Sequence, residues 1–104
     1  MVSGAEAVAR YIAGQSREAF LEDERTQDAV LMKLVIIGEA ASRIPEDFRL
    51  AHANVPWRQI AAFRNLAVHA YFALSWSQVW ETASRSVPEL RIQILEILGS
   101  ATAE

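Results

Sequence analysis

The chain has 104 residues, of which 52% are hydrophobic and 22% are charged, and this balance favours one ordered domain over residues 1–104. The absence of cysteine excludes disulfide bonds and thiolate metal sites. A net charge of −3 argues against a general electrostatic attraction to nucleic acid, so an RNA contact would have to come from a few well-placed arginines.

The same composition argues against export and membrane insertion. The first residues lack the basic segment and apolar run of a signal peptide. The longest apolar run, residues 34–38, is far shorter than the roughly 20 residues needed to cross a bilayer. We therefore expect a cytoplasmic protein with no membrane partner.

The first part of the chain shows helical boundary signals and no persistent alternation of a strand. A first helix is expected over residues 5–13, followed by Gly14 in the usual position after a helix end. Ser16 is suited to cap a short helix over residues 17–21.

A longer helix is predicted over residues 26–43, and its apolar positions cover nearly the whole circumference. Such a helix is either wrapped by its own chain or partly covered by a second subunit, and the sequence favours the two equally. Gly38 permits close approach of another helix, so Gly38 and Glu39 are assigned to a dimer interface or to a structural role. Glu39, a carboxylate among apolar residues, is expected to pair with an arginine or cap a backbone amide.

Three further helices are predicted after this one. A short one covers residues 44–49, with Pro45 in its first turn, and the next opens at Pro56 and fails near residues 71–74. Ser75 and Gln78 form a capping box for the last helix, which Pro88 should kink or split near residue 87. Gly99 should end it, leaving residues 100–104 as a fraying tail. The fold class is therefore an all-α antiparallel bundle of about four to five main helices.

The face of the helix that opens at Pro56 carries residues at spacings of three and four, namely Trp57, Ile60, Ala61, Arg64 and Val68.

The candidate chemistry lies near the end of that helix. Asn65 and His69, four residues apart, share a helix face, and Tyr71 follows where the helix gives way. Arg64 and His69 differ by about 140° on an ideal helix, so they would converge through the reach of Arg64, local unwinding, or a dimer interface. The structural alternative is a hydrogen-bonded histidine, a surface cation and a core tyrosine. The other histidine, His52, lies in a polar turn and is expected to be exposed.

No metal or cofactor is expected. The two histidines are distant and the carboxylates are scattered, without the spacing of metal ligands. The chain also lacks a phosphate-binding glycine loop, a nucleophilic serine motif and a dinucleotide fingerprint.

Several segments, in this order and spacing, resemble the HepT-like family of the HEPN superfamily. They are Gln27-Asp28-Ala29-Val30, Ile36-Ile37-Gly38-Glu39-Ala40-Ala41, Val55-Pro56-Trp57-Arg58, Phe63-Arg64-Asn65, His69-Ala70-Tyr71-Phe72, Val79-Trp80 and Pro88-Glu89-Leu90. The resemblance covers most of the chain. The pattern of an arginine, four residues, a histidine, one residue and a tyrosine is weak alone and strong among these flanking segments. One departure is a first helix that begins about one or two turns later than in the family.

The resemblance implies a helical HEPN-type homodimer that acts as a metal-independent ribonuclease toxin in a type VII-like toxin–antitoxin pair. Arg64 and His69 would be catalytic at a dimer cleft, with Asn65 supporting them. A minimal nucleotidyltransferase of the MntA type would be the antitoxin, silencing the toxin by adding AMP to Tyr71.

These residue types suit RNA cleavage by attack of the 2′-hydroxyl. An imidazole can take or give a proton near neutral pH, and a guanidinium can hold the phosphate. AMP on a neighbouring tyrosine would add bulk and negative charge where the RNA phosphate must sit. The alternative is a non-catalytic helical dimer that binds a nucleotidyltransferase partner or nucleotide, which the acidic charge balance favours.

Overall fold

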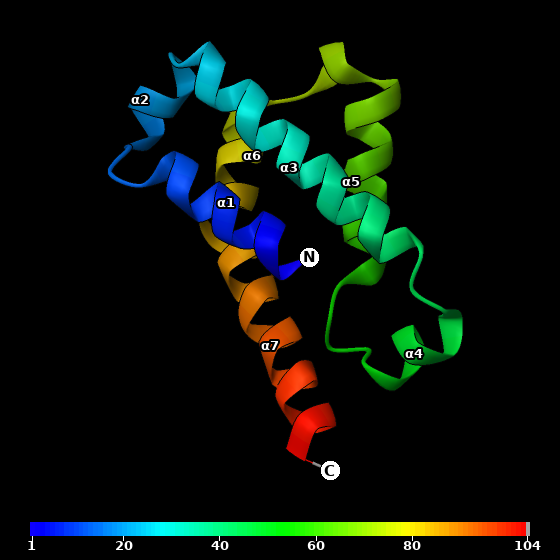
Figure 1. Cartoon of the computed structure of the whole chain (residues 1–104). Helices are drawn as coiled ribbons and strands as arrows, with labels where there is room; N and C mark the ends of the chain where they lie inside the picture. The colour runs from blue at the N-terminus through cyan, green and yellow to red at the C-terminus, as the bar shows by residue number, and fades with distance from the viewer. Residues whose placement is uncertain (104) are drawn as a thin grey trace.

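The computed structural model describes residues 1–103, with side chains described for residues 1–99. Over this part of the chain every regular element is helical (Figure 1), as the sequence predicts. The elements are α1 (Val2–Ile12), α2 (Arg17–Leu21), α3 (Glu24–Ser42), α4 (Glu46–Ala51), α5 (Trp57–His69), η1 (Tyr71–Ala73), α6 (Trp76–Glu81), η2 (Thr82–Ser86) and α7 (Val87–Ala103).

Helix α3 is the centre of the arrangement. It packs against α1 on one side and against α5, which returns antiparallel to it, on the other, while α7 lies along α1 (Figure 1). The Cα positions extend over 46 × 29 × 17 Å. Since packed helices lie about 8–10 Å apart, the shortest dimension holds about two helix layers. Helix α5 therefore has neighbours on few sides.

The predicted caps in the first half are confirmed. Gly14 has a φ of 77°, the left-handed conformation that glycine adopts without a steric penalty after a helix end. The Ser16 hydroxyl accepts a hydrogen bond from the Ala19 amide at 3.1 Å. The predicted start of the first helix at residue 5 is wrong, because α1 begins at Val2. Likewise α3 begins before residue 26, because Asp23 accepts from the Thr26 amide at 3.1 Å and caps it.

Prolines mark the starts of the next helices. Pro45 and Pro56 stand at the N-cap positions of α4 and α5, so the prediction that Pro45 lies inside the first turn is off by one residue. The Ser75 hydroxyl accepts from the Gln78 amide at 3.4 Å and caps α6, as predicted.

Pro88 has the predicted effect by a particular route. The turn before it, η2, is π-helical, and α7 begins at Val87. A proline has no amide hydrogen and crowds the preceding turn, so one wider turn lets the helix continue past it.

The prediction that Gly99 ends the last helix is wrong, because α7 continues to Ala103. Among the described residues only Gly14 is a glycine with a positive φ, so Gly99 stays helical at a cost of about 1 kcal/mol relative to alanine. The predicted fraying concerned residues 100–104, whose side chains lie outside the described part of the chain, as does all of Glu104.

The core is formed where α1, α3, α6 and α7 meet, and Phe20 of α2 and Val55 before α5 complete it. Its fully buried large side chains are Val8, Phe20, Val30, Val55 and Val79. On α5, Trp57 and Ala67 are buried whereas Val68 is 47% exposed, so the face shared by Trp57 and Val68 is not buried along its whole length. No helix in the described part of the chain is long and apolar enough to cross a membrane.

Candidate functional site

The residues singled out in the sequence lie on the C-terminal half of α5 and in η1, beside α3. At Gly38 the two helices lie very close together: a Cβ built on it would lie 2.3 Å from the Cβ of Arg64. The close approach that Gly38 permits is therefore to α5 of its own chain, and it sets the position of Arg64.

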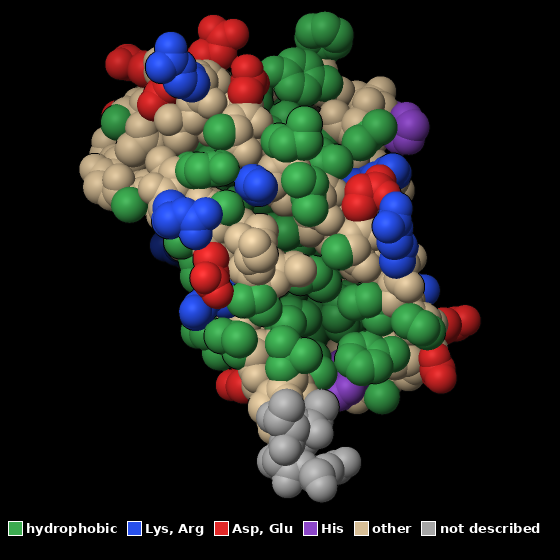
Figure 2. All heavy atoms as spheres, viewed as in Figure 1, with side chains coloured by type: hydrophobic (Ala, Val, Ile, Leu, Met, Phe, Trp, Pro, Cys, Tyr) green, Lys and Arg blue, Asp and Glu red, His purple; other side chains and the backbone are tan. Residues whose placement is uncertain are grey.

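Arg64 is held by polar contacts on two sides. Its Nη2 forms an ion pair with the Glu39 carboxylate, and its Nη1 donates a hydrogen bond to Asn65 Oδ1 at 2.9 Å. The side chains of Arg64 and Glu39 are 28% and 37% exposed, so the pair is accessible from solvent. Figure 2 shows acidic side chains flanked by basic ones where α3 passes α5. The guanidinium has five N–H donors, and these two contacts leave others for a further acceptor.

His69 is the last residue of α5, and its side chain is exposed. Among the described residues no side-chain hydrogen bond or ion pair joins His69 to Arg64. Asn65 bonds to Arg64 rather than to His69. A single chain therefore presents the arginine and the histidine on one stretch of surface without bringing them together.

Tyr71 begins η1 and is tied back to the first turns of α3. Its hydroxyl donates to Asp28 Oδ1 at 3.3 Å, and its ring meets those of Phe72 and Trp76 edge-on, with centroids 5.5 and 6.1 Å away. Partial burial, followed by the negative charge of Asp28 and its hydrogen bond and then the charge of Glu24, raises the pKa of Tyr71 above its usual value of 10.0. The hydroxyl therefore carries its proton at neutral pH.

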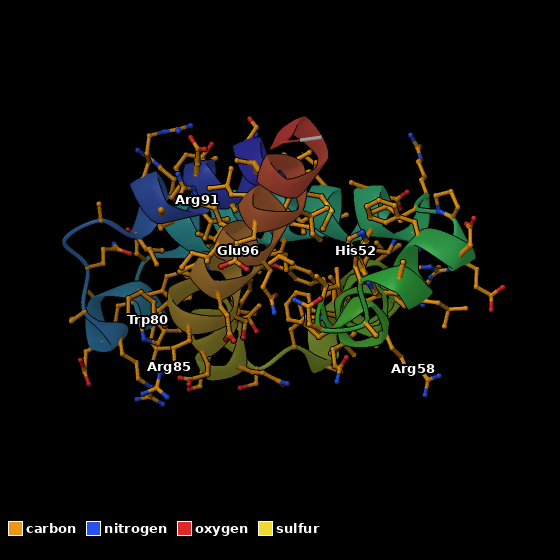
Figure 3. The ribbon with its side chains drawn as sticks, turned by 90° about the horizontal axis from the view of Figure 1, so that it is seen from below. His52, Arg58, Trp80, Arg85, Arg91 and Glu96 are labelled. Carbon is orange, nitrogen blue, oxygen red and sulfur yellow. The ribbon has the colours of Figure 1, made fainter. Side chains whose placement is uncertain are left out.

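Another imidazole and two other cationic groups lie elsewhere. His52, predicted to be exposed, is half-buried because its ring packs against Phe48 with centroids 4.5 Å apart. Arg58 points away from the bundle, while Arg91 lies beside α1 (Figure 3) and pairs with Glu6 at 3.6 Å.

A cavity of about 510 Å³ lies away from Arg64, between α5 and the segment formed by α6, η2 and α7. Leu34 and Ile37 of α3 contribute to its lining together with Phe63 and Leu66 of α5. None of its lining residues is ionisable, so it offers no acid, base or charge for catalysis. The candidate chemistry therefore belongs to the open surface where α3 meets the end of α5.

The all-helical fold, with an arginine, a histidine and a tyrosine at the end of α5, is the arrangement expected from the resemblance to HEPN-type domains. The family described as "Ribonuclease HepT-like" matches residues 2–97. The chain therefore belongs to the HepT-like family.

Two relatives illustrate the match. The chain is 40% identical over 87 residues to "Putative RNase TTE0752" of Caldanaerobacter subterraneus subsp. tengcongensis, covering 84% of this chain and 78% of that protein. It is 43% identical over 74 residues to "Probable ribonuclease HepT" of Thermococcus cleftensis, covering 71% and 67%. No solved structure matches the chain significantly.

Sequence reasoning missed Asp28 as a neighbour of Tyr71. The two residues are 43 positions apart, and no local pattern joins them. The available signal was indirect, since Asp28 stands in one of the segments that carry the family resemblance.

Proposed function

We propose that this chain is a metal-independent endoribonuclease in which Arg64 and His69 are catalytic and Asn65 holds the arginine in place. The observation that carries the proposal is the family match over residues 2–97. Within this range the chain has the arginine, the histidine and the tyrosine of the motif in order. The solvent access of Arg64 and the exposure of His69 support it, because both side chains can reach an RNA strand without an opening of the fold.

The reaction uses the nucleophile that RNA itself carries. The 2′-oxygen bonds to the adjacent phosphorus, the bond from phosphorus to the 5′-oxygen breaks, and a cyclic phosphate remains. His69 takes the proton of the 2′-hydroxyl or supplies one to the leaving 5′-oxygen, a contribution typically of ~10²–10⁴ in rate. Arg64 stabilises the charge that develops on the phosphate, typically worth ~10²–10³ for one preorganised donor.

A homodimer would supply both the acid and the base. Met32 and Ile36 on α3 are 60% and 47% exposed, and Glu39 continues their stripe at helical spacing. Glu39 forms the ion pair with Arg64 of α5, and the exposed Val68 lies one turn after Arg64 on the same helix. These residues therefore extend the stripe of α3 onto α5. A two-fold contact through these apolar residues would bring two copies of the motif to one cleft.

The dimer has its own test in light scattering after size-exclusion chromatography. Met32→Glu should shift the chain toward monomer, since it places a charge in the proposed interface. Leu50→Glu, at a residue 71% exposed on α4, is the matched control and should leave the mass unchanged. A monomeric wild-type protein at micromolar concentration would contradict the two-copy cleft.

The proposed biological setting is a type VII-like toxin–antitoxin pair with an MntA-type nucleotidyltransferase as antitoxin. Tyr71 is the residue on which AMP would be added, and its 42% exposure leaves the hydroxyl within reach of a partner enzyme. The added phosphodiester would place negative charge beside the surface that RNA must occupy.

The activity is tested with purified protein and a labelled RNA in EDTA. Wild type should cleave, and Arg64→Ala and His69→Ala should each lose at least ~10²-fold of the rate while remaining folded. Arg58→Ala removes an exposed cation from the same helix and should retain the rate. Equal cleavage by wild type and the two site variants would mean that a contaminating nuclease is responsible.

A second function, docking of a nucleotidyltransferase or nucleotide without catalysis, is favoured by one observation. Glu39 neutralises Arg64, and the whole chain carries a charge of −3, both of which weaken RNA binding. Stable binding of an MntA-type nucleotidyltransferase by a chain that is free of AMP and cleaves no RNA would favour this second function.

A further inference from the structure

The hydroxyl of Tyr71 faces a carboxylate of its own chain. Asp28, on the second turn of α3, accepts its hydrogen bond at 3.3 Å. Glu24, one turn earlier on the same helix, adds negative charge at longer range. The groups packed against the Tyr71 ring, Phe72 and Trp76, carry no charge.

This arrangement differs from that of an ordinary surface tyrosine. The ring meets those of Phe72 and Trp76 edge-on, and the hydroxyl donates to one named acceptor, Asp28. The residue is still 42% exposed, so an electrophile can approach it from solvent. A hydroxyl that is positioned, open and paired with a base is arranged for group transfer.

We propose that Asp28 is the general base for nucleotide transfer to Tyr71, so that the chain itself supplies the base for its own modification. The inference rests on the proposed function, which makes Tyr71 the acceptor of AMP. With ATP as donor, the Tyr71 oxygen bonds to the α-phosphorus, the bond from that phosphorus to the bridging oxygen of the β-phosphate breaks, and pyrophosphate leaves. The phenolic proton passes to the Asp28 carboxylate.

The need for a base follows from the protonation of the acceptor. The raised pKa of Tyr71 leaves a negligible fraction of phenolate near neutral pH. Attack on the phosphorus by a phenolate formed in advance is therefore disfavoured, and the phenolic proton has to leave as the new bond forms. Protein kinases use an aspartate for the same task on a substrate hydroxyl. Here the aspartate lies on the acceptor protein.

The proposal is tested with a chemical electrophile that needs no partner enzyme, an adenosine that carries an arylsulfonyl fluoride. The Tyr71 oxygen bonds to sulfur, fluoride leaves, and the proton goes to Asp28. Peptide mass spectrometry measures the labelling rates of Tyr71 and Tyr11, the two tyrosines of the chain. Tyr11 is 37% exposed, has no hydrogen-bonding carboxylate among the described residues, and serves as the internal reference.

Asp28→Asn should slow the labelling of Tyr71 about tenfold or more at pH 7, relative to Tyr11. Its rate should then rise about tenfold per pH unit, as a phenolate reaction does, whereas the wild-type rate should change little between pH 6 and 9. Asp28→Glu should restore part of the rate. Glu24→Gln is the matched control, because it removes a neighbouring charge but no contact with the hydroxyl, and it should not slow the reaction.

Equal or faster labelling of Tyr71 in Asp28→Asn would overturn the proposal, since Asp28 would then only hold the pKa high. Failure to label Tyr71 faster than Tyr11 in the wild type would overturn it as well.

A parallel reaction with an MntA-type nucleotidyltransferase and ATP separates this inference from the proposed function. AMP added equally to wild type and Tyr71→Phe would refute the acceptor assigned to Tyr71. AMP added to Tyr71 at the same rate in wild type and Asp28→Asn would refute only the base.

Discussion

Replacing Gly38 by alanine is the sharpest test of how α3 positions Arg64. The new Cβ would lie 2.3 Å from the Cβ and 2.8 Å from the Cγ of Arg64. Atoms at these distances overlap, and the Cβ of Arg64 cannot rotate away because the α5 backbone fixes its position. The two helices must therefore move apart.

The expected magnitude combines two opposing effects. Alanine is favoured over glycine inside a helix by about 1 kcal/mol, whereas overpacking of a buried contact costs about 1–3 kcal/mol. Because the clash at Gly38 involves an immobile atom, the cost should fall at the upper end, and the free energy of unfolding should drop by about 2 kcal/mol. For a chain of 104 residues, this is a substantial part of a total of roughly 5–15 kcal/mol.

Urea denaturation followed by circular dichroism at a fixed protein concentration measures the effect. The midpoint for Gly38→Ala should fall by about 1 M, given a slope of about 2 kcal/mol per M. Gly99→Ala is the matched control, because a Cβ there meets nothing within 4 Å among the described residues and should stabilise α7 by up to about 1 kcal/mol. If Gly38→Ala were as stable as wild type, α3 and α5 would not be in close contact at Gly38.

Three further outcomes are expected. Phe20→Ala, at a fully buried residue, should lower the free energy of unfolding by about 3–5 kcal/mol, whereas Phe72→Ala, at a fully exposed one, should change it by less than about 0.5 kcal/mol in the same urea titration. Hydrogen bonds from the Thr26 side chain and amide lower the pKa of Asp23 below its ordinary value of 3.8. The ionised Asp23 therefore stabilises the fold above pH 3.8, and this stabilisation is lost as the pH falls through the pKa of Asp23 in the folded state. The acid-induced loss of stability should be smaller in Asp23→Asn. The raised pKa of Tyr71 predicts that its phenolate absorbance, measured in a Tyr11→Phe background, has a midpoint above pH 10.0. The contribution of the protonated Tyr71 to stability should be present below pH 10 and should decline as the pH rises through the pKa of Tyr71 in the folded state. A midpoint at or below 10.0 would refute the Asp28 contact.

The parts of the fold that the sequence predicts well are set by neighbouring residues. Gly14, Ser16 and Ser75 mark helix boundaries because their conformational freedom or hydroxyls satisfy backbone groups within three residues. Pro88 likewise acts on the turn before it. Gly99 shows the limit of such signals, because a glycine can remain helical when the helix continues beyond it, as α7 does to Ala103.

The contacts of the candidate site could not be predicted in the same way. Glu39 and Arg64 are 25 positions apart, and the sequence indicated only that Glu39 needs a partner, without identifying it. The contact of Asp28 with Tyr71 depends on the antiparallel register of α3 and α5, which follows from packing around Gly38 rather than from either segment alone. The burial of Ala67 and the exposure of Val68 likewise depend on how α5 is rotated against α3.

The contacts along α3 connect the two halves of the proposed function. Its C-terminal half holds Arg64 through Glu39, and its N-terminal half holds Tyr71 through Asp28, while Gly38 fixes the spacing between the helices. A shift of α5 along α3 by one helical turn would break both polar contacts together. The arginine proposed as catalytic and the tyrosine proposed for modification are therefore aligned by one helix, so a negative charge added at Tyr71 would arise at a defined place relative to Arg64. For this reason the register of α3 and α5 matters for both the proposed cleavage and its proposed control.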